Sequence, residues 1–407
     1  MRILYFHQHF STPRGGEGIR SYQLSMELLR QGHTVTMVCG SNLQGSTNLT
    51  GDFVNGRREG MVDGIKVIEF SLSYSNNDSF LKRSGTFLSF AWNSVWVALR
   101  EPCDLVFATT TPLTAAIPGI AARWLRGKPF VFEVRDLWPE LPKAMGVITN
   151  PVVLGMMSVL EWVAYHSAQR CVGLSPGIVE GITRRGIAPS RVAMVPNGCD
   201  IELLATDKVE PFYPQGLTPA DFIVVYTGTF GIANGLDAVL DAAAVLKKRG
   251  NAKIKIALVG DGKTMAHLLK RAKTENLDNV SFHSRIPKTS LAGLYKAAGL
   301  GLQVLSNVPA FYYGTSPNKF FDYLASGLPV LTNYPGWVAD LVKENNCGLA
   351  VPPQDAEKFA DALIYAEQNR EEMKAAGRNA NILARTQFER SSLARKWVAW
   401  VIGTLKP

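Results

Sequence analysis

Several patterns that define common classes of protein are missing from this sequence of 407 residues. No run of about 20 apolar residues occurs, so we predict no membrane-spanning segment. The N-terminus has only the short apolar run Ile3–Phe6 before His7, which predicts a first β-strand and not a signal peptide. No Asp-x-Asp pair is present to clamp a metal-bound diphosphate, so a site of that kind is not expected.

Cysteine is scarce, and the cysteines that occur show no Cys-x-x-Cys spacing. A scattered pattern of this kind predicts reduced core residues in a cytosolic protein, with no disulfide framework. The five positions are Cys39, Cys103, Cys171, Cys199 and Cys347.

Length and composition indicate a globular protein with more than one core. A chain of 407 residues is too long for a single core and predicts two domains. Apolar residues make up 46% and charged residues 19%, which is typical of a globular chain. The net charge of +9 is compatible with acidic substrates, nucleic acid or an anionic membrane, and does not choose among them.

Two apolar stretches have the pattern of helices that lie in a membrane interface. Thr86–Leu99 contains Phe87, Phe90, Trp92 and Trp96 between basic flanks, and Val152–Ala164 is similar but is interrupted by Glu161. Amphipathic core helices are far more common than interfacial ones, so for each stretch a buried helix is the favoured interpretation.

Short apolar runs alternate with stretches of helical period along the whole chain, which predicts parallel sheets covered on both faces. In the first half we expect strands at 3–6, 34–38, 66–70, 105–108, 130–134, 170–173 and 192–195, with helices at 19–30, 85–99, 113–125, 152–168 and 177–185. The polar residues 41–62 predict a mobile loop.

A linker composition at 199–221 separates this half from a second series of the same kind. There we expect strands at 223–226, 255–259, 280–283, 301–305 and 329–332, and helices at 236–249, 264–275, 291–298, 317–326, 338–345, 356–369 and 391–404. The fold class is therefore α/β, with two tandem Rossmann-like, doubly wound domains. Such domains are expected to face each other across a ligand-binding cleft.

Three glycine-rich turns follow predicted strands. The first contains Gly15 and Gly16, the second runs from Thr227 to Gly235, and the third from Gly260 to Thr264. None has the Gly-x-Gly-x-x-Gly spacing of a dinucleotide site, but each permits close approach of backbone to a phosphate or sugar. The third resembles the end of a P-loop, yet a P-loop needs glycine at position 257, where this chain has alanine.

The stretch from Tyr312 to Thr332 predicts a helix with a phosphate site at its start. Ser316 is expected to cap the helix, Pro317 to occupy its first position and Gly327 to end it. Asn318 and Lys319 then lie in the first turn, beside the free N–H groups and positive end of the helix dipole. The alternative is an ordinary capped helix of an α/β protein.

The densest polar cluster of the first half, Glu133 to Glu140, follows a predicted strand and so is expected at the cleft. Its carboxylates and Arg135 are suited to position sugar hydroxyls or a phosphate. The alternative is a pair between Arg135 and Asp136 that only shapes the loop. His7 and His9 share one face of a strand, but no acidic or cysteine cluster accompanies them, so structural histidines are favoured over a metal site.

These motifs together resemble the retaining glycosyltransferases of family 4, which have the GT-B fold. The resemblance is carried by the Gly15-Gly16 loop, Val195-Pro-Asn197-Gly-Cys-Asp200, the Gly228–Gly235 loop, Val259-Gly-Asp-Gly262 and Tyr323-Leu-Ala-Ser-Gly327-Leu-Pro-Val330, in that order over nearly the whole chain. The Glu133–Glu140 cluster and Ser316–Asp322 are similar to the WbuB-like branch, which builds O-antigen and capsule repeat units.

The resemblance implies an N-terminal acceptor domain at 1–200, with the helix of 388–407 packing back on it, and a C-terminal donor domain at 201–387. It implies that a nucleotide-sugar donor binds at Gly228, Thr229, Phe230, Asn234, Gly262, Lys263, Ser284, Arg285, Ile286, Ser316, Pro317, Asn318 and Asp322, with Gly15 and Gly16 as an acceptor or phosphate loop and Asn197 in the cleft. Lys319, Asp136, Arg135 and Glu140 are the candidate catalytic residues. No metal and no cofactor are expected.

Some family residues differ in this chain. Asp322 and Gly314 stand where the family has two glutamates, Thr229 and Asn234 replace the usual Arg and Lys of the second-domain loop, and Arg135 replaces a frequent His. Departure of the leaving group concentrates about two charges on the diphosphate, which need fixed cationic or N–H donors. Lys319 and the start of its helix are the expected source, with Lys263 and Arg285 as further candidates.

We therefore expect a cytoplasmic enzyme, peripheral to the inner membrane, that moves a sugar from a UDP-sugar to a lipid-linked saccharide acceptor with retention. The basic flanks of Thr86–Leu99 and the positive charge suit an anionic leaflet. The transferred sugar would be a hexose or an N-acetylhexosamine, and no nucleic-acid partner is expected. A nucleotide-sugar epimerase of the same fold and a non-catalytic nucleotide-binding protein are the alternatives.

Overall fold

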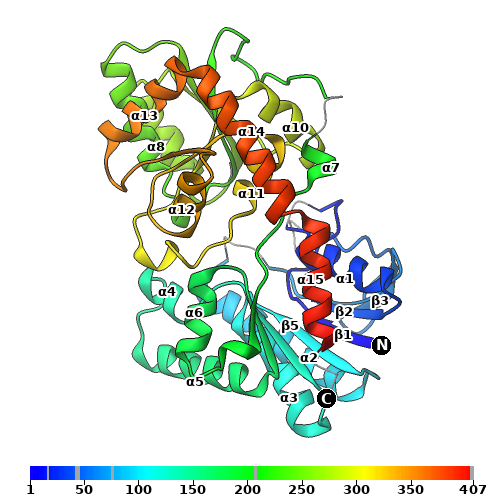
Figure 1. The fold of residues 1–407 in the computed structure, drawn as a ribbon. Helices are drawn as coiled ribbons and strands as arrows, with labels where there is room; N and C mark the ends of the chain where they lie inside the picture. Colours follow the sequence, from blue (N-terminus) through cyan, green and yellow to red (C-terminus); the bar gives the residue numbers. More distant parts are fainter. Residues whose placement is uncertain (16–17, 42–45, 75–77, 206–208, 404–407) are drawn as a thin grey trace. The chain divides into compact units, whose positions relative to one another are not determined.

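A computed structural model describes residues 1–407 apart from 16–17, 42–45, 75–77, 206–208 and 404–407. The chain forms two compact units, each with its own sheet (Figure 1). Unit 1 comprises Met1–Pro196, Gly314–Ser316 and Ser391–Pro407, and unit 2 comprises Asn197–Tyr313 and Pro317–Arg390. The predicted α/β class is confirmed, since each unit is a twisted sheet flanked by helices.

Unit 1 has an eight-stranded sheet in the order β3-β4-β2-β1-β5-β6-β7-β8. All pairs are parallel except β3 with β4. The strands are β1 (Arg2–Phe6), β2 (Thr34–Gly40), β3 (Arg57–Val62), β4 (Ile65–Phe70), β5 (Leu105–Thr109), β6 (Phe130–Val134), β7 (Arg170–Gly173) and β8 (Val192–Met194).

The prediction of a loop over residues 41–62 is wrong for its last part, because β3 forms an antiparallel edge strand there. Most of its residues are exposed or half-buried, so it has no apolar run that would have indicated a strand. Its position at the sheet edge requires only one hydrogen-bonded neighbour, which explains why a polar sequence suffices. Residues 42–45 of the predicted loop lie outside the described residues.

The helices of unit 1 cover both faces of its sheet. They are α1 (Arg20–Arg30), α2 (Phe80–Arg100), α3 (Ile117–Arg126), α4 (Glu140–Ala144), α5 (Pro151–Ser167), α6 (Pro176–Arg184) and most of α15 (Arg390–Ile402), with short 3-10 turns at Leu113–Ala116 and Pro189–Arg191. Helix α2 begins five residues before its predicted start, because the Ser79 side chain accepts from the backbone N–H of Lys82 and caps it.

Alternate residues of β1 and β5 define the two faces. Leu4, Phe6 and Val106 belong to a core with residues of α2, α3 and α5. Tyr5 and Phe107 point to the opposite face, where Trp397 of α15 packs against both rings and Ser21 of α1 contacts the Tyr5 hydroxyl at 3.1 Å. The chain therefore returns to unit 1 at its C-terminal end to complete this second layer.

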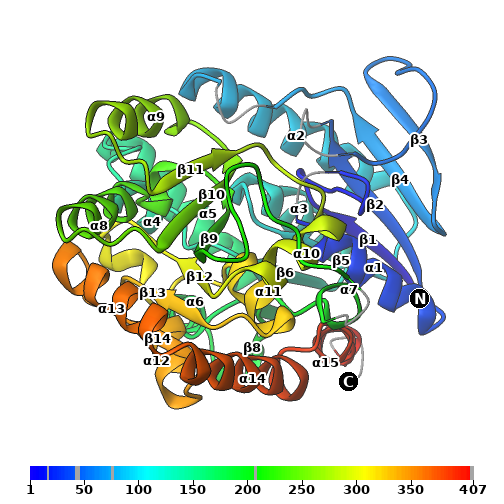
Figure 2. The same ribbon diagram turned by 90° about the horizontal axis from the view of Figure 1, so that it is seen from above.

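Unit 2 has a six-stranded, wholly parallel sheet in the order β11-β10-β9-β12-β13-β14 (Figure 2). The strands are β9 (Phe222–Thr229), β10 (Ile254–Asp261), β11 (Val280–His283), β12 (Leu300–Gln303), β13 (Val330–Thr332) and β14 (Gly348–Ala350). A parallel sheet covered on both faces needs near-continuous apolar strands, and β9, β10 and β12 have them.

The helices of unit 2 are α7 (Ile201–Leu204), α8 (Asp237–Lys248), α9 (Met265–Thr274), α10 (Lys288–Ala297), α11 (Asn318–Ser326), α12 (Trp337–Glu344), α13 (Ala356–Gln368) and α14 (Arg370–Gln387), with 3-10 turns at Ile232–Asn234 and Pro309–Phe311. Residues of α8, α9 and α13 pack into the core on one face of the sheet. On the other face Tyr323 of α11 lies against the backbone of Gly301.

Helix α14 was not predicted. Its buried positions are mostly small, namely Met373, Ala376, Gly377, Ala380, Leu383 and Ala384. Alanine and glycine contribute little to an apolar pattern, although they allow α14 to approach the end of α11 closely. A Cβ on Gly377 would lie 2.2 Å from the carbonyl oxygen of Gly327.

All five cysteines are buried and free, as expected from their spacing. Among the described residues, no helix combines the length and apolarity needed to cross a bilayer.

Candidate active site

The carboxyl end of the unit 2 sheet carries two of the predicted glycine-rich turns side by side. Strands β9 and β10 pair up to their last residues, with Gly228 opposite Gly260 and Thr229 opposite Asp261. The Phe230 N–H then donates to the Asp261 carbonyl at 2.9 Å, and the Thr264 N–H donates back to the Phe230 carbonyl at 3.0 Å. The two turns therefore form one hydrogen-bonded unit.

Glycine is required in these turns because the backbones touch. Gly260 has φ +153°, and a Cβ there would lie 1.8 Å from the Gly228 carbonyl oxygen. Gly262 has φ +157°, and its Cβ would lie 2.6 Å from the Phe230 carbonyl oxygen. Gly228 has φ +138° and faces a different neighbour, since its Cβ would lie 3.0 Å from Cε of Lys319. The predicted turn and the predicted lysine thus meet at Gly228.

Lys319 is held in place by three contacts within unit 2. Its Nζ donates to the Tyr226 hydroxyl at 3.1 Å and to Oδ1 of Asn234 at 3.0 Å, and it lies 4.4 Å from the centre of the Tyr226 ring. The Tyr226 hydroxyl in turn donates to the Thr229 carbonyl at 2.8 Å. An ammonium has three N–H donors, so the third remains available for a ligand.

The two residues that contact Lys319, Tyr226 and Asn234, carry no negative charge, and this affects the pKa of the ammonium. Desolvation lowers the pKa of the Lys319 ammonium from 10.5 to about 7. A bound anion would supply the missing charge and favour the ammonium form. This environment is typical of a cation that receives a ligand, and differs from that of a structural ion pair.

The start of α11 differs from the prediction. Helix α11 begins at Asn318 and Pro317 is the N-cap residue, with no side-chain cap hydrogen bond, so Ser316 is not the cap and Pro317 is not the first helical residue. A proline disfavours helical dihedrals in the residue before it, which here is Ser316. Pro317 itself is also extended, with ψ 125°, so the helix starts one residue later. The predicted end is confirmed: Gly327 has φ +69° and closes the helix.

A group of buried hydroxyls around Thr227, the residue before the Gly228 turn, was missed in the sequence. The Thr227 N–H donates to the Tyr323 hydroxyl at 3.0 Å, and the Thr227 hydroxyl lies 2.8 Å from that of Tyr295. Rings of Tyr295 and Tyr323 pack edge to face with centres 5.2 Å apart. The only signal in the sequence was the pair Tyr226-Thr227 near the end of a buried strand. It was weak, because tyrosine and threonine are also common in the cores of sheets.

The other predicted donor residues of unit 2 lie at the same edge of the sheet or near it. Lys263 is exposed between β10 and α9, and Asn318 is exposed in the first turn of α11. Ser284 and Arg285 are exposed and Ile286 is half-buried in the turn between β11 and α10. Asp322 is buried on α11 and its charge helps to raise the pKa of Tyr295. The Phe230 side chain is fully buried in the core, so only its backbone is placed to meet a ligand.

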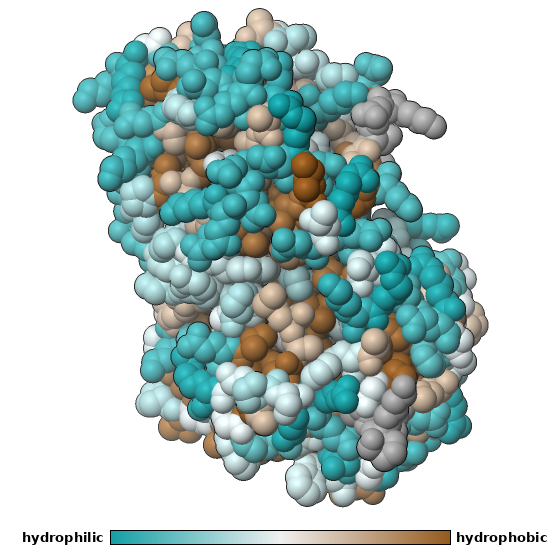
Figure 3. Space-filling view, viewed as in Figure 1, coloured by the Kyte–Doolittle hydropathy of each residue, from teal (hydrophilic) through white to brown (hydrophobic). Residues whose placement is uncertain are grey.

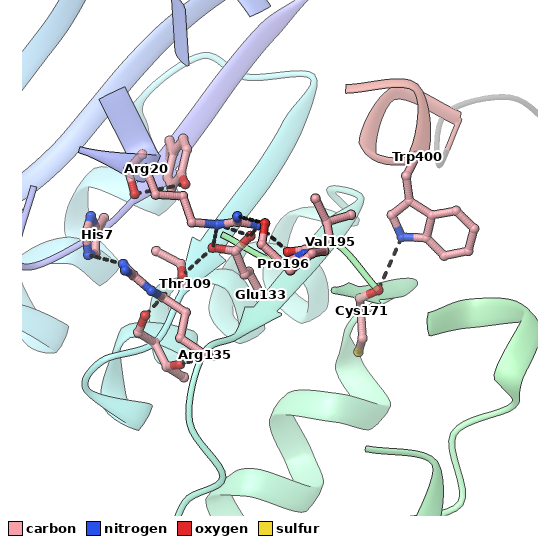
Figure 4. A network of polar contacts seen from close by, with 12 residues as sticks. His7, Arg20, Thr109, Glu133, Arg135, Cys171, Val195, Pro196 and Trp400 are labelled. Carbon is pink, nitrogen blue, oxygen red and sulfur yellow. Dashed lines mark hydrogen bonds and ion pairs between the residues drawn. The ribbon is translucent and has the colours of Figure 1, made fainter. Parts of the chain in front are cut away.

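In unit 1 the three carboxylates of the predicted Glu133–Glu140 cluster have separate partners. Glu133 is fully buried and paired with Arg20, the first residue of α1, at 2.8 Å (Figure 4). Arg20 also donates to the carbonyls of Pro196 and Val195 at 2.7 and 2.8 Å. Glu140 pairs with Arg184 at the surface at 2.8 Å. The cluster in the sequence is therefore not a cluster of carboxylates in space.

Arg135 and Asp136 do not pair with each other in the described structure. Asp136 accepts from the Thr111 hydroxyl at 3.0 Å, and desolvation raises the pKa of its carboxyl. Nη1 of Arg135 lies 3.2 Å from Nε2 of His7 (Figure 4). The predicted alternative, an Arg135–Asp136 pair that shapes the loop, is therefore wrong.

The remaining predicted residues are Gly15, Gly16 and Asn197. The Gly15 N–H donates to the Thr12 carbonyl at 2.9 Å in the turn before α1. Gly16 lies outside the described residues. Asn197 is buried at the first position of unit 2.

Gly228→Ala is expected to weaken UDP binding several-fold, because the new methyl group displaces Lys319 and the residue keeps a strained positive φ. Isothermal titration with UDP measures the effect. The matched control is Gly250→Ala, which has φ +70° in the same unit but open space around its Cβ. Equal UDP affinity in the two variants would contradict the placement of Lys319 in the site.

Comparison with known proteins is consistent with this arrangement. The sequence profile "Glycosyl transferase 4-like domain" matches residues 15–198, and "Glycosyl transferases group 1" matches residues 212–382. WcaI of Escherichia coli (strain K12), described as a colanic acid biosynthesis glycosyl transferase, is 23% identical over 80% of this chain and 82% of its own.

Solved structures share the fold. WaaG, a glycosyltransferase involved in lipopolysaccharide biosynthesis, has a TM-score of 0.72 at 17% identity, covering 98% of this chain and 100% of WaaG. HepE of Anabaena, solved with UDP and glucose, has a TM-score of 0.71 at 17% identity and full coverage of both chains.

The two profiles and the fold define this chain as a glycosyltransferase with the GT-B architecture. Within that class it belongs to the family 4-like enzymes, and its sequence is similar to that of the colanic acid biosynthesis glycosyl transferase WcaI.

Proposed function

We propose that this enzyme transfers a sugar, with retention of configuration, from a UDP-sugar to a lipid-linked saccharide during assembly of a surface polysaccharide such as O-antigen or capsule. The transferred sugar is a hexose or an N-acetylhexosamine. The observation that carries the proposal is Lys319, an ammonium with neutral partners beside the Gly228 and Gly262 turns.

The donor diphosphate is assigned to Lys319 and the start of α11. Helix α11 begins at Asn318, so its first N–H groups add a partial positive charge close to the ammonium. Support for UDP as the nucleotide comes from HepE, which was solved with UDP and with UDP-glucose. The exposed Ser284 and Arg285 offer a surface for the base, and Asp322 for the ribose, as the family resemblance implies.

The proposed chemistry depends on stabilising the leaving group. When the bond from the sugar to the phosphate breaks, negative charge grows on the diphosphate, and a cation already in place lowers that barrier. In the front-face route of retaining enzymes the departing phosphate oxygen takes the proton of the acceptor hydroxyl. A protein base is then unnecessary, and Asp136, Arg135 and Glu140 are assigned to orienting the acceptor.

The proposed membrane association rests on exposed apolar side chains along three helices of unit 1. Helices α2 and α3 pack together, and α3 packs on α5. Their exposed side chains are Leu81, Leu88, Trp92 and Trp96 on α2, Trp124 and Leu125 on α3, and Val152, Met156, Val159 and Trp162 on α5. Brown side chains are visible at the lower left edge of Figure 3, where Figure 1 shows α5.

Basic residues accompany this apolar face. Lys82 and Arg100 lie on α2, and Arg123 and Arg126 lie in the last turn of α3. Tryptophan beside arginine and lysine is typical of proteins that bind an anionic interface. The face therefore suits the cytoplasmic leaflet of the inner membrane, where a lipid-linked acceptor would be available.

The proposal is tested by incubating the full chain with a panel of nucleotide sugars and polyprenyl-diphosphate saccharides in anionic vesicles. Mass spectrometry of the lipid fraction should show one added sugar, and NMR of the product should show the anomeric configuration of the donor. Release of UDP that does not depend on acceptor, or an inverted product, would overturn it.

A further inference from the structure

A group of cationic and aromatic side chains at the carboxyl end of the unit 1 sheet is not used by the donor site. We call it the arginine cluster; its members are His7, His9, Tyr74, Arg83, Phe87 and Arg135. His7 and His9 follow β1, Arg135 follows β6, and Arg83 and Phe87 lie in the first two turns of α2. The cluster therefore combines residues that follow strands β1 and β6 with residues of helix α2.

The contacts run continuously from one arginine to the other. Arg135 lies 3.2 Å from Nε2 of His7, and the His7 and His9 rings have centres 6.5 Å apart. The His9 ring packs on Tyr74 with centres 4.6 Å apart, and the Arg83 guanidinium lies 5.6 Å from the centre of the Tyr74 ring. Phe87 stacks on Tyr74 with ring centres 5.6 Å apart and meets the His9 ring edge to face with centres 6.4 Å apart.

The positive charge of the cluster has no paired carboxylate. In the described part of the chain neither Arg83 nor Arg135 forms an ion pair, whereas other arginines of unit 1, such as Arg20 and Arg185, do. The charge of Arg135 reaches Asp136, but that carboxylate bonds to Thr111. Burial, together with the charges of both arginines, lowers the pKa of His9 to about 4, so the ring is neutral at physiological pH.

Two buried donors in the cluster lack an acceptor. Arginine has only donors, so Nε2 of His7 must accept from Arg135, and the neutral ring then carries its proton on Nδ1. That Nδ1 is buried without a hydrogen-bond partner, and so is Nε of Arg83. A buried donor without an acceptor is costly, and two of them beside uncompensated charge point to a missing acceptor group.

The acceptor that such donors lack is supplied by an anion with several oxygens. Guanidinium groups bind phosphate through parallel hydrogen bonds, and a phosphate also accepts from a neutral imidazole N–H. Arg83, Arg135 and His9 are only partly buried, so an external group can reach them. Further along α2, the exposed Leu88, Trp92 and Trp96 lie on the helix face turned away from Arg83 and are suited to contact a hydrocarbon chain.

We propose that the arginine cluster binds the phosphate end of a lipid-linked substrate, with Arg83 and Arg135 on the phosphate oxygens and the lipid chain along the exposed face of α2. The inference rests on the proposed function, because it assigns the anionic part of the acceptor. It places that part on unit 1, separate from the donor diphosphate at Lys319. The ligand class is a polyprenyl phosphate or diphosphate.

Calorimetric titration of the full chain with farnesyl diphosphate tests this assignment. Arg83→Gln and Arg135→Gln are each expected to weaken binding about tenfold or more, since each removes a charged hydrogen-bond donor from the phosphate. The matched control is Arg30→Gln, because Arg30 is an exposed arginine at the end of α1 in the same unit and belongs neither to the cluster nor to the apolar face. The control is expected to bind within about twofold of the parent protein.

Three further measurements separate the possible outcomes. Unchanged UDP affinity in both cluster variants supports the inference, and a parallel loss of UDP affinity would assign the cluster to the donor and overturn it. Inorganic pyrophosphate should bind more weakly than farnesyl diphosphate; equal affinity would show a site for free phosphates and overturn the lipid assignment. Equal losses in Arg30→Gln and Arg83→Gln would also overturn it.

The inference and the proposed function can fail separately. Nucleotide-sugar turnover does not enter the farnesyl diphosphate titration. Specific loss of lipid binding in the cluster variants, with no transfer from any nucleotide sugar, would therefore retain the lipid site and reject the transfer reaction proposed above. Transfer to lipid acceptors that is unaffected by Arg83→Gln and Arg135→Gln would do the reverse.

Discussion

Replacing Lys319 with methionine is expected to lower turnover by about a hundredfold or more, with little change in the stability of the protein. Methionine fills a similar volume but carries no charge, so the developing charge on the diphosphate loses its nearest cation. Stability is expected to be kept because the Lys319 ammonium is desolvated and has no charged partner, as its lowered pKa of about 7 shows. Turnover under saturating donor and the midpoint of thermal unfolding are the two measurements.

Lys270→Met is the matched control, since Lys270 is an exposed lysine on α9 of the same unit. It is expected to keep full turnover. Turnover near the parent value in Lys319→Met would remove Lys319 from the mechanism. A large fall in the unfolding midpoint would instead show that its hydrogen bonds to Tyr226 and Asn234 have a structural role.

The same lysine predicts the pH dependence of UDP binding. Above pH 7 the free protein increasingly has a neutral Lys319, whereas bound diphosphate favours the ammonium and raises its pKa. Binding therefore takes up a proton in this range, and affinity should fall as pH rises, by up to about tenfold per pH unit. Lys319→Met should bind UDP more weakly but without this slope. An unchanged slope in the variant would assign the titration to another group.

Glu133→Ala is expected to lower the free energy of unfolding by about 3–5 kcal/mol, because it leaves the Arg20 guanidinium buried without its counter-charge. The Arg20 and Glu133 side chains are 5% and 0% exposed, and Glu133 accepts from Nε and Nη2 of Arg20 and from the Thr109 hydroxyl. Chemical denaturation followed by circular dichroism measures the change. Arg20 also donates to the carbonyls of Val195 and Pro196, where the chain passes from unit 1 to unit 2. The loss of stability should therefore extend to these residues.

The matched control breaks an exposed ion pair of the same unit. Arg184 and Glu140 are about half exposed, so Arg184→Ala is expected to cost only about 0–1 kcal/mol. Similar losses in Arg184→Ala and Glu133→Ala would contradict the distinction between a buried and a solvated pair. Replacing Arg20 and Glu133 together by Met and Leu should recover only part of the loss, because the Val195 and Pro196 carbonyls then lack a donor.

The sequence by itself determined the layers of both units. Strands such as β1, β5, β9 and β10 are buried on both faces, so they appear as continuous apolar runs that need no knowledge of their neighbours. The glycine turns at Gly228 and Gly260 were also visible, because contact between two backbones excludes a side chain. Several elements without such a pattern were not predicted, among them the polar edge strand β3, the three-residue strand β14 and the alanine-rich α14.

The partners of charged side chains were decided only by the tertiary structure. Glu133, Asp136 and Glu140 are close in sequence, but Glu133 lies on a strand and the other two follow it. Their partners in the fold are therefore different: Arg20, Thr111 and Arg184, respectively. Arg20 and Glu133 are 113 residues apart, and no local pattern relates them. The same holds for Lys319. Its position in a helix start was predicted, whereas its hydrogen-bond partners Tyr226 and Asn234 come from β9 and from the 3-10 turn that follows it. Burial and hydrogen bonding in a site depend on distances between segments remote in the chain, and a linear pattern does not contain those distances.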